Sequence, residues 1–457
     1  MATSENTVEM IEYRLVIVQA DSSKVLAFDT IGGYRLPSVR IPQWTRPARS
    51  LCKAIRSVWG LRVFVLDLFT ECAECPAWAV AELLIPNGNS ELKPVTLDAV
   101  EPSELGEEQW AHMAALLSEA SGSSLSRVGW INEAVTWLEK ETGKNLTSKE
   151  NIEQYNAGGG FALLRFHTEG DETYWLKAAG DPNAHELAVT RLLSDLAGDY
   201  LPEMIASKPE WNAWLMSGAA TQVNELPGDP LQLFRFLEDA VESMARIQLN
   251  TCGHSTGLLK AGAFNQSMDS LVARSAELFN SLDEAMHLQT STKVCRIDSK
   301  RLRELRATLV EVCQRIEGLA VPMTIVHGDM NYSNILTGCR HCQFIDWSEA
   351  YVSTPFITLQ HLLLLNKMES PEIKAFTDRL LRDRYKKVWL AACESATIDR
   401  GFVYMPLLAV ASAIYGRGDW FQSRSRVDAR RNSYLRSLAR HLDRAAQAPD
   451  LQEALCR

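Results

Sequence analysis

Three polar side chains that suit phosphoryl transfer lie close together in the last third of the 457-residue chain. Asp329 and Asn334 stand in the segment 324–336, whose pattern predicts an apolar strand followed by a tight polar turn. Asp346 follows across a predicted β-hairpin. A base, a neutral oxygen ligand and a charged ligand at one cleft mouth are what transfer of phosphate from ATP needs, because its catalysis is mostly positioning plus neutralisation of charge by Mg²⁺.

A purely structural turn is the alternative interpretation of this segment. Asp and Asn side chains stabilise turns by bonding to their own backbone, so Asp329 and Asn334 alone do not require a site. That interpretation leaves the acid at Asp346 unexplained. We therefore favour the catalytic interpretation.

The apolar spacing and turn residues around these positions predict a sheet followed by helices. Lys177 stands at the end of an apolar strand, where a cation is costly unless it has an anionic partner. Strands are expected just before Asn156 and at 161–166, 174–178, 201–206 and 211–216, and helices at 185–196, 230–249, 266–290, 299–318 and from 355 to the end.

Gly158, Gly159 and Gly160 form a predicted turn between the first two strands of that sheet. Successive glycines let backbone N–H groups approach phosphates closely. The spacing differs from the G-x-G-x-x-G of protein kinases, and a plain hairpin turn explains it equally well. Both interpretations stay open.

In this order, the residues from about 150 to the C-terminus resemble the aminoglycoside-phosphotransferase and choline-kinase-like superfamily. The family pattern H-G-D-x-x-x-x-N-I-L is present from His327 to Leu336, and the hydrophobic-Ile-Asp-Trp element that follows it is present as Ile345-Asp346-Trp347. The resemblance implies a bilobal protein-kinase-like domain. Its sheet lobe would cover 146–220 and its helical lobe, with the catalytic loop and the acceptor site, 221–457.

Carried over residue by residue, the resemblance makes Asp329 the base that accepts the proton of a substrate hydroxyl, or at least orients that hydroxyl. It makes Asn334 and Asp346 the ligands of Mg²⁺, a hard cation that prefers oxygen. His327, the other residue assigned to the catalytic loop, is expected to brace it through hydrogen bonds.

The resemblance also assigns the upstream residues. Lys177 would contact nucleotide phosphates and pair with a helix glutamate, for which Glu186 is the candidate. A lysine that snorkels from a sheet edge is the alternative. The glycine turn 158–160 would lie on the nucleotide side.

The sequence departs from the family pattern after Asp346. The family often continues with a Pro and then an Asp that begins a helix, whereas this chain has Pro355 and no such Asp up to His361. The departure puts close kinship with the antibiotic-modifying members in doubt and leaves the residues of the predicted reaction intact.

The first 145 residues predict a separate α/β region. A helix over 46–59 that ends at Gly60, placed among strands, resembles a Nudix-hydrolase-like sandwich. Nudix chemistry needs glutamates on that helix to hold Mg²⁺, and here the positions carry residues such as Ala54, Ser57 and Val58. The resemblance therefore implies the scaffold without the hydrolase. The strands are expected at 11–20, 24–28, 61–69 and 77–85, and further helices around 107–120 and 128–142, before a polar linker at 143–150.

Composition restricts partners and location. The chain has 46% hydrophobic and 23% charged residues, as soluble globular proteins do. Its net charge of −10 argues against nucleic acid as a partner. The first residues lack the pattern of a signal peptide, and no apolar run reaches the roughly 20 residues that span a bilayer. We expect a cytoplasmic protein that does not bind membranes.

Two cysteine pairs have the spacing of zinc ligands. Cys72 and Cys75 stand in the N-terminal region, and Cys339 and Cys342 in the hairpin between the catalytic loop and Asp346. Because the pairs fall in different predicted domains, accidental spacing is the favoured interpretation and a shared zinc the alternative.

Together these patterns predict an α+β protein that transfers the γ-phosphate of ATP, with Mg²⁺, to a hydroxyl of a small molecule, with an amine as the second choice of acceptor. The alternative is a non-catalytic nucleotide-binding sensor or scaffold, in which a kinase-like and a hydrolase-like domain read a ligand. Asp329, Asn334, Asp346 and Lys177 argue against that alternative, because a non-catalytic relative is expected to lose at least one of them. The acceptor, the choice of ATP over GTP and the oligomeric state stay open.

Overall fold

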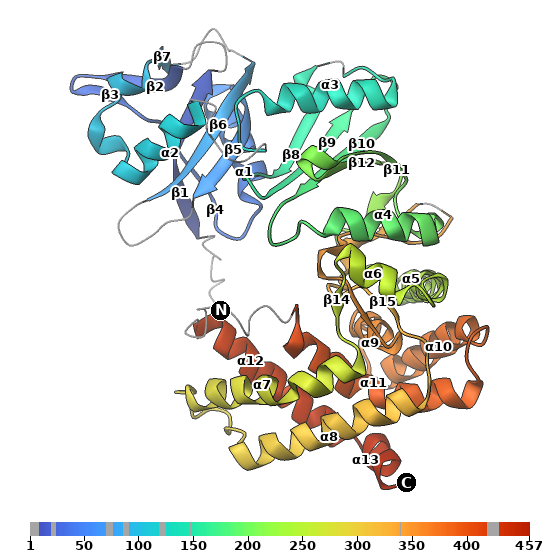
Figure 1. Ribbon diagram of the computed structural model, residues 1–457. Coiled ribbons are helices and arrows are strands. Elements are labelled where there is room, and N and C mark those ends of the chain that lie inside the picture. Colours follow the sequence, from blue (N-terminus) through green and yellow to red (C-terminus); the bar gives the residue numbers. More distant parts are fainter. Residues whose placement is uncertain are drawn as a thin grey trace. The chain divides into compact units, whose positions relative to one another are not determined.

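The computed structural model has two compact units (Figure 1). Unit 1 comprises Met1–Leu187 and Met204–Ala219, and unit 2 comprises Ala188–Glu203 and Ala220–Arg457. Sheets and helices are mixed, so the predicted α+β class is confirmed. The structure describes residues 9–19, 24–69, 76–85, 91–117, 125–146, 148–338, 340–417 and 429–457.

The N-terminal part of unit 1 is a seven-stranded sheet with the order β3-β2-β1-β6-β5, in which β4 pairs with β1 and β7 with β2. The pairing of β1 with β6 is parallel, and the others are antiparallel. The strands are β1 (Met10–Gln19), β2 (Lys24–Thr30), β3 (Gly33–Arg35), β4 (Ser38–Pro42), β5 (Arg62–Phe69), β6 (Ala77–Ile85) and β7 (Lys93–Val95).

Helices lie against this sheet on both faces. The predicted helix before Gly60 is α1 (Pro47–Trp59), which buries Leu51 and Ile55 and ends where Gly60 takes a φ of 70°. Alternate residues of β1 face α1, among them Tyr13 and Leu15. The other face of the sheet packs against α2 (Glu107–Leu117) and α3 (Trp130–Thr142).

The second sheet of unit 1 is antiparallel, with the order β11-β12-β10-β9-β8. Its last strand begins later than the pattern predicts. Trp211 belongs to a short 3-10 turn, and Asn212 takes the left-handed backbone that separates this turn from β12. The strands are β8 (Ile152–Asn156), β9 (Phe161–His167), β10 (Thr173–Ala179), β11 (Met204–Lys208) and β12 (Ala213–Ser217).

The two sheets of unit 1 share one hydrophobic core. The Trp130 ring of α3 lies 5.5 Å from the Trp211 ring. The Gln154 side chain of β8 accepts a hydrogen bond from the backbone of Val65 at 2.8 Å and donates one back to its carbonyl at 2.7 Å. The predicted domain boundary near residue 145 therefore lies inside one compact unit. The Nudix-like identity of the first part stays a prediction.

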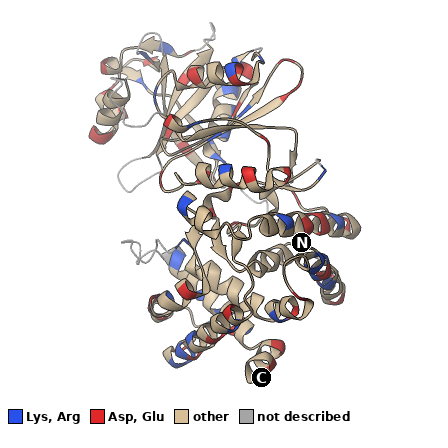
Figure 2. Ribbon diagram, turned by 45° about the vertical axis from the view of Figure 1, so that its right-hand side comes forward, with Lys and Arg blue, Asp and Glu red and all other residues tan. Residues whose placement is uncertain are grey.

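Unit 2 is helical apart from two small three-stranded sheets, β13-β16-β17 and β14-β18-β15. Acidic and basic side chains are interspersed along its outer helices (Figure 2). Helix α4 (Glu186–Ala197) crosses from unit 1 into unit 2. The other helices are α5 (Pro230–Asn250), α6 (Ser255–Ala261), α7 (Met268–His287), α8 (Ser299–Gly318), α9 (Phe356–Leu364), α10 (Pro371–Trp389), α11 (Ser395–Tyr415), α12 (Ala429–Ala446) and α13 (Pro449–Cys456). The strands are β13 (Thr221–Gln222), β14 (Phe264–Asn265), β15 (Thr324–Val326), β16 (Ile335–Thr337), β17 (Gln343–Phe344) and β18 (Tyr351–Ser353).

Helix α11 is, by length and composition, the one candidate for a membrane span among the described residues. However, 56% of its apolar window is buried within the protein. It contacts α8, α9 and α12. We assign it to the core of unit 2.

Candidate active site

The segment predicted to be the catalytic loop begins where the buried strand β15 ends. Gly328 follows with a φ of 81°, a conformation that glycine adopts without strain. A Cβ atom at this position would also overlap the carbonyl oxygen of Glu349. Glycine is therefore the residue that lets the loop pass so close to the segment after Asp346.

His327 is fully buried and connects the loop to the strand before Asp346. Its Nε2 atom donates a hydrogen bond to the carbonyl oxygen of Ile345 at 2.8 Å. Its ring lies 4.6 Å from the ring of Trp347. These contacts suit the bracing role expected from the sequence, because the His327 side chain connects two segments of the backbone scaffold.

Asp329 has an exposed side chain that two amides orient. Asn331 donates to its Oδ1 atom at 3.1 Å, and Asn334 donates to its Oδ2 atom at 3.1 Å. Asn334 also donates to the backbone carbonyl of Asp329 at 2.9 Å. Because the amide nitrogen of Asn334 is used in this way, its Oδ1 atom is the end that can bind a cation.

Asp346 stands at the end of the hairpin formed by β16 and β17. Ile335 pairs with Phe344, and the N–H of Ile345 donates to the carbonyl of Asn334 at 3.1 Å. Asp346 itself takes φ 66° and ψ 66°, a left-handed conformation that is uncommon for a residue with a side chain. Such strain persists where the surroundings impose it, and it often marks functional sites.

Glu349 is a third acid at this end of unit 2, and the sequence interpretation missed it. Burial raises the pKa of its carboxyl group, Arg417 opposes that rise, and the charges of Asp329 and Asp346 add to it. Arg417 reaches Glu349 at 3.4 Å. The missed signal was a second acid shortly after Asp346 in a segment that already carried one predicted ligand.

Lys177 and Glu186 form a buried ion pair in unit 1. The Nζ atom of Lys177 lies 2.5 Å from Oε1 of Glu186, and their side chains are 8% and 1% exposed. The rings of Phe161 and Trp214 lie 5.4 and 5.8 Å from the ammonium group. The structure therefore brings together the lysine and the glutamate that the sequence singled out.

The glycine turn lies at the rim of the same sheet. Gly158 takes a φ of 125°, and Gly159 follows it before the turn closes at Gly160. The N–H of Gly180, just after β10, donates to the carbonyl of Gly160 at 2.5 Å. Asp67 of β5 approaches the turn from the N-terminal sheet, since a Cβ atom at Gly158 would lie 3.5 Å from its Oδ1 atom.

The predicted residues therefore fall into two groups, one in each unit. Lys177, Glu186 and the glycine turn 158–160 belong to unit 1. Asp329 with its neighbours and Asp346 belong to unit 2. Each group is ordered by its own local contacts.

The donor set in unit 2 fits a hard divalent cation. An amide oxygen from Asn334 and a carboxylate from Asp346 are oxygen ligands of the kind that Mg²⁺ takes in kinases, where phosphates and waters supply the rest. Within the described residues, no group of three or more His, Cys, Asp or Glu side chains is arranged to hold a metal ion without such help.

The zinc hypothesis depends mostly on residues outside the described part of the chain, namely Cys72, Cys75 and Cys339. The fourth cysteine, Cys342, is buried, and its Sγ atom lies 3.3 Å from Oδ2 of Asp239. Burial first, and then Asp239, raise the pKa of this thiol well above its ordinary value. A thiol with a raised pKa is a poor metal ligand, because zinc binds the thiolate.

No protein-family model and no curated protein matches the sequence. Solved structures that resemble the chain include small-molecule phosphotransferases. A choline/ethanolamine kinase family protein from Mesorhizobium loti has 16% identity and a TM-score of 0.43 over 71% of this chain and 98% of its own. Macrolide 2'-phosphotransferase from Brachybacterium faecium has 14% identity and a TM-score of 0.43, covering 67% and 97%. The GDP complex of aminoglycoside 2'-phosphotransferase-IIIa has 14% identity and a TM-score of 0.42, covering 68% and 98%.

These likenesses are low in identity and in TM-score. The assignment of a function to this chain therefore depends on its own residues.

Proposed function

We propose that the protein is an ATP- and Mg²⁺-dependent kinase that phosphorylates a hydroxyl group of a small molecule, with an amine as the second choice of acceptor. The observation that carries the proposal is the exposed carboxylate of Asp329. Asn331 and Asn334 orient it, and Asn334 is bonded through its backbone to the strand that leads to Asp346.

Asp329 acts as the base or orients the acceptor. Its two oxygens each receive one amide hydrogen bond, which fixes the orientation of the carboxylate and leaves lone pairs for a substrate hydroxyl. Its exposure lets an acceptor approach it. His327 and Gly328 keep the loop against the segment that carries Asp346.

Asn334 and Asp346 would hold Mg²⁺, which neutralises charge on the transferred phosphate when bound. The strained backbone of Asp346 is the feature that aims its carboxylate. Ser348 supports that orientation by donating to its Oδ1 atom at 3.1 Å.

Lys177 would bind nucleotide phosphates. Glu186 holds the Lys177 ammonium group in a nearly buried position. The lysine side chain therefore loses little conformational entropy when it binds an anion. The glycine turn 158–160 is proposed on the nucleotide side, where its backbone N–H groups suit phosphate oxygens. We further propose a cytoplasmic setting, since every described cysteine is a free thiol.

An ATP-consumption screen over hydroxylated and amino metabolites tests the proposal. The wild-type chain should release ADP only when a suitable acceptor is present, and phosphorylated acceptor should form in equal amount. Asp329→Asn supplies the matched control, because it keeps the shape of the side chain and removes the base. Nucleotide binding without acceptor-dependent turnover would instead support the sensor alternative.

A further inference from the structure

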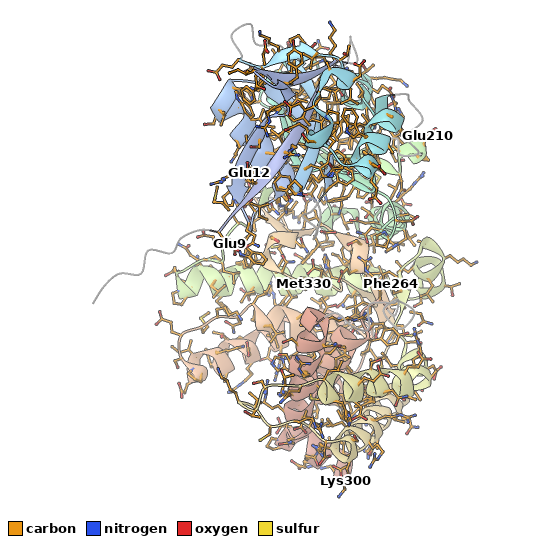
Figure 3. All side chains as sticks on the ribbon, turned by 90° about the vertical axis from the view of Figure 1, so that its left-hand side faces the viewer. Glu9, Glu12, Glu210, Phe264, Lys300 and Met330 are labelled. Carbon is orange, nitrogen blue, oxygen red and sulfur yellow. The ribbon has the colours of Figure 1, made fainter. Side chains whose placement is uncertain are left out.

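The N-terminal sheet of unit 1 carries a polar face that the proposed kinase reaction does not use. In the antiparallel pairing of β1 with β4, Glu12 lies opposite Arg40 and Arg14 lies opposite Ser38. Because side chains alternate along a strand, these four residues of β1 and β4 lie on one face of the sheet, the face that is turned away from α1. Figure 3 labels Glu9 and Glu12 at the beginning of this strand.

A cavity of about 1030 Å³ opens on this face. Its lining includes Arg14, Arg35 and Arg40, the three acids Glu9, Glu12 and Glu104, and the aromatic ring of Phe28. Small-molecule sites have volumes of this order and combine apolar walls with a few placed polar groups.

The buried carboxylate of Glu104 contacts two of these arginines. It is 3% exposed, and its carboxylate accepts from Nε of Arg35 at 3.0 Å and from the N–H of Leu36 at 3.0 Å. Nε of Arg14 lies 3.8 Å from the same carboxylate, and the Arg14 guanidinium also donates to the backbone carbonyl of Glu104. A buried carboxylate thus anchors two guanidinium groups at the wall of one cavity.

Arg40 has a corresponding partner on the strand beside it. It reaches Glu12 at 3.5 Å, while Ser38 donates to the other oxygen of Glu12 at 2.7 Å. The Ser38 hydrogen bond, together with Arg40 and Arg14, lowers the pKa of Glu12 against the opposing effect of burial. Glu12 therefore stays ionised and keeps Arg40 oriented.

The three guanidinium groups retain donors beyond those that these acids occupy. Each guanidinium has five N–H donors in a planar fork that matches the two oxygens of a carboxylate or phosphate. Anchoring by a carboxylate removes much of the freedom that an arginine would lose on binding a ligand. The arrangement suits an oxyanion better than a neutral molecule.

We propose that this cavity binds a small metabolite that carries an oxyanion, either a phosphate or a carboxylate. Arg14, Arg35 and Arg40 contact the anionic group, Glu104 and Glu12 position those arginines, and Phe28 lies against the remainder.

Isothermal titration of the full-length wild-type chain with inorganic phosphate, pyrophosphate and citrate tests the site. At least one of these probes should bind, and the stronger one distinguishes a phosphate ligand from a carboxylate ligand. Arg35→Gln and Arg40→Gln should each weaken binding by about tenfold or more, as expected for loss of a charge-assisted hydrogen bond. Both side chains are exposed, at 59% and 72%, so the variants should fold.

Two controls separate this site from the proposed nucleotide site. Arg56→Gln removes an exposed arginine of α1 outside the cavity and should leave the affinity unchanged. The double variant Lys177→Met/Glu186→Leu removes the proposed phosphate lysine of the kinase reaction without leaving Glu186 unpaired, and it should also leave binding of the preferred probe intact. The proposal is overturned if none of the probes binds, or if Arg35→Gln and Arg40→Gln both bind the preferred probe as tightly as the wild type. Neither result depends on whether the kinase turns over.

Discussion

Lys177 and Asp329 stand in different compact units, and their charged side chains differ in burial and in the groups that contact them. Lys177 is buried against Glu186, so two opposite charges satisfy each other away from water. Asp329 is exposed, and among the described residues the neutral amides of Asn331 and Asn334 orient its carboxylate. The lysine is thus fixed before any ligand arrives, whereas the aspartate keeps its charge available to a substrate. The following predictions test this contrast.

The largest effect is expected from Asp329→Asn. Turnover should fall by about 10²–10⁴, the range that general-base catalysis contributes, because an amide cannot accept the proton. Titration with ATP should show nearly unchanged affinity. Asp383→Asn, an exposed acid on α10, is the matched control and should keep wild-type turnover. Wild-type turnover in Asp329→Asn would exclude this residue as the base.

Breaking the buried pair should instead cost stability. Glu186→Gln leaves the Lys177 charge without its partner and should lower the free energy of unfolding by about 3 kcal/mol, measured by chemical denaturation. The double variant Lys177→Met/Glu186→Leu should recover most of that loss and still bind ATP poorly. Asp329→Asn should leave stability within about 0.5 kcal/mol. Equal losses in Asp329→Asn and Glu186→Gln would remove the contrast.

Gly328→Ala tests how closely the catalytic loop must pass the Glu349 backbone. The substitution should lower stability by about 1–3 kcal/mol and reduce kcat, since the loop must move and the backbone is left-handed. Gly318→Ala is the control, because a Cβ atom there meets nothing within 4 Å. Normal kcat in Gly328→Ala would show that the loop tolerates displacement.

The smallest effect concerns pH. Burial first, and to a smaller extent His327, lower the pKa of His361 on α9 from an ordinary value of 6.5 to about 4, against the opposing effects of a hydrogen bond with the backbone of Ala409 and of Asp329. The unfolded chain therefore binds the proton more readily, and His361 makes stability fall as the pH drops from about 6.5 to about 4.

Replacing His361 by Gln should flatten this part of the stability profile, followed by thermal unfolding at several pH values. Glu349 makes stability rise as the pH drops, because its raised pKa favours protonation of the folded state. This contribution is present both in the wild type and in His361→Gln, so it does not affect the comparison. His441→Gln, an exposed histidine on α12, should leave the profile unchanged. A wild-type slope in His361→Gln would contradict the assignment.

Local signals in the sequence predicted the elements that carry the candidate site. The helix expected at 299–318 is α8, and the strand expected at 77–85 is β6, because apolar spacing and flanking turn residues act over a few positions. The hairpin between Asn334 and Asp346 was also predicted, since two short apolar runs flank a polar turn.

Long-range contacts were beyond the reach of such patterns. Residues 143–150 are polar and predict a linker, yet Gln154 bonds to Val65 and Trp211 packs on Trp130. Glu104, which anchors two arginines, stands in a short 3-10 turn with no periodic signal. These contacts join positions far apart in the chain, so no local spacing encodes them.

The two hydrogen bonds between Gln154 and Val65 have a consequence for how the chain folds during its synthesis. Domains generally form in the order of synthesis, so the N-terminal sheet can be complete before β8 emerges. Strand β8 then docks on a surface that already exists, through a side chain that takes up both backbone groups of Val65. The sheet that carries Lys177 would thus be assembled on a template. A chain that begins at residue 146 would have to form the same sheet with that template missing and with the apolar surface around Trp211 open to water.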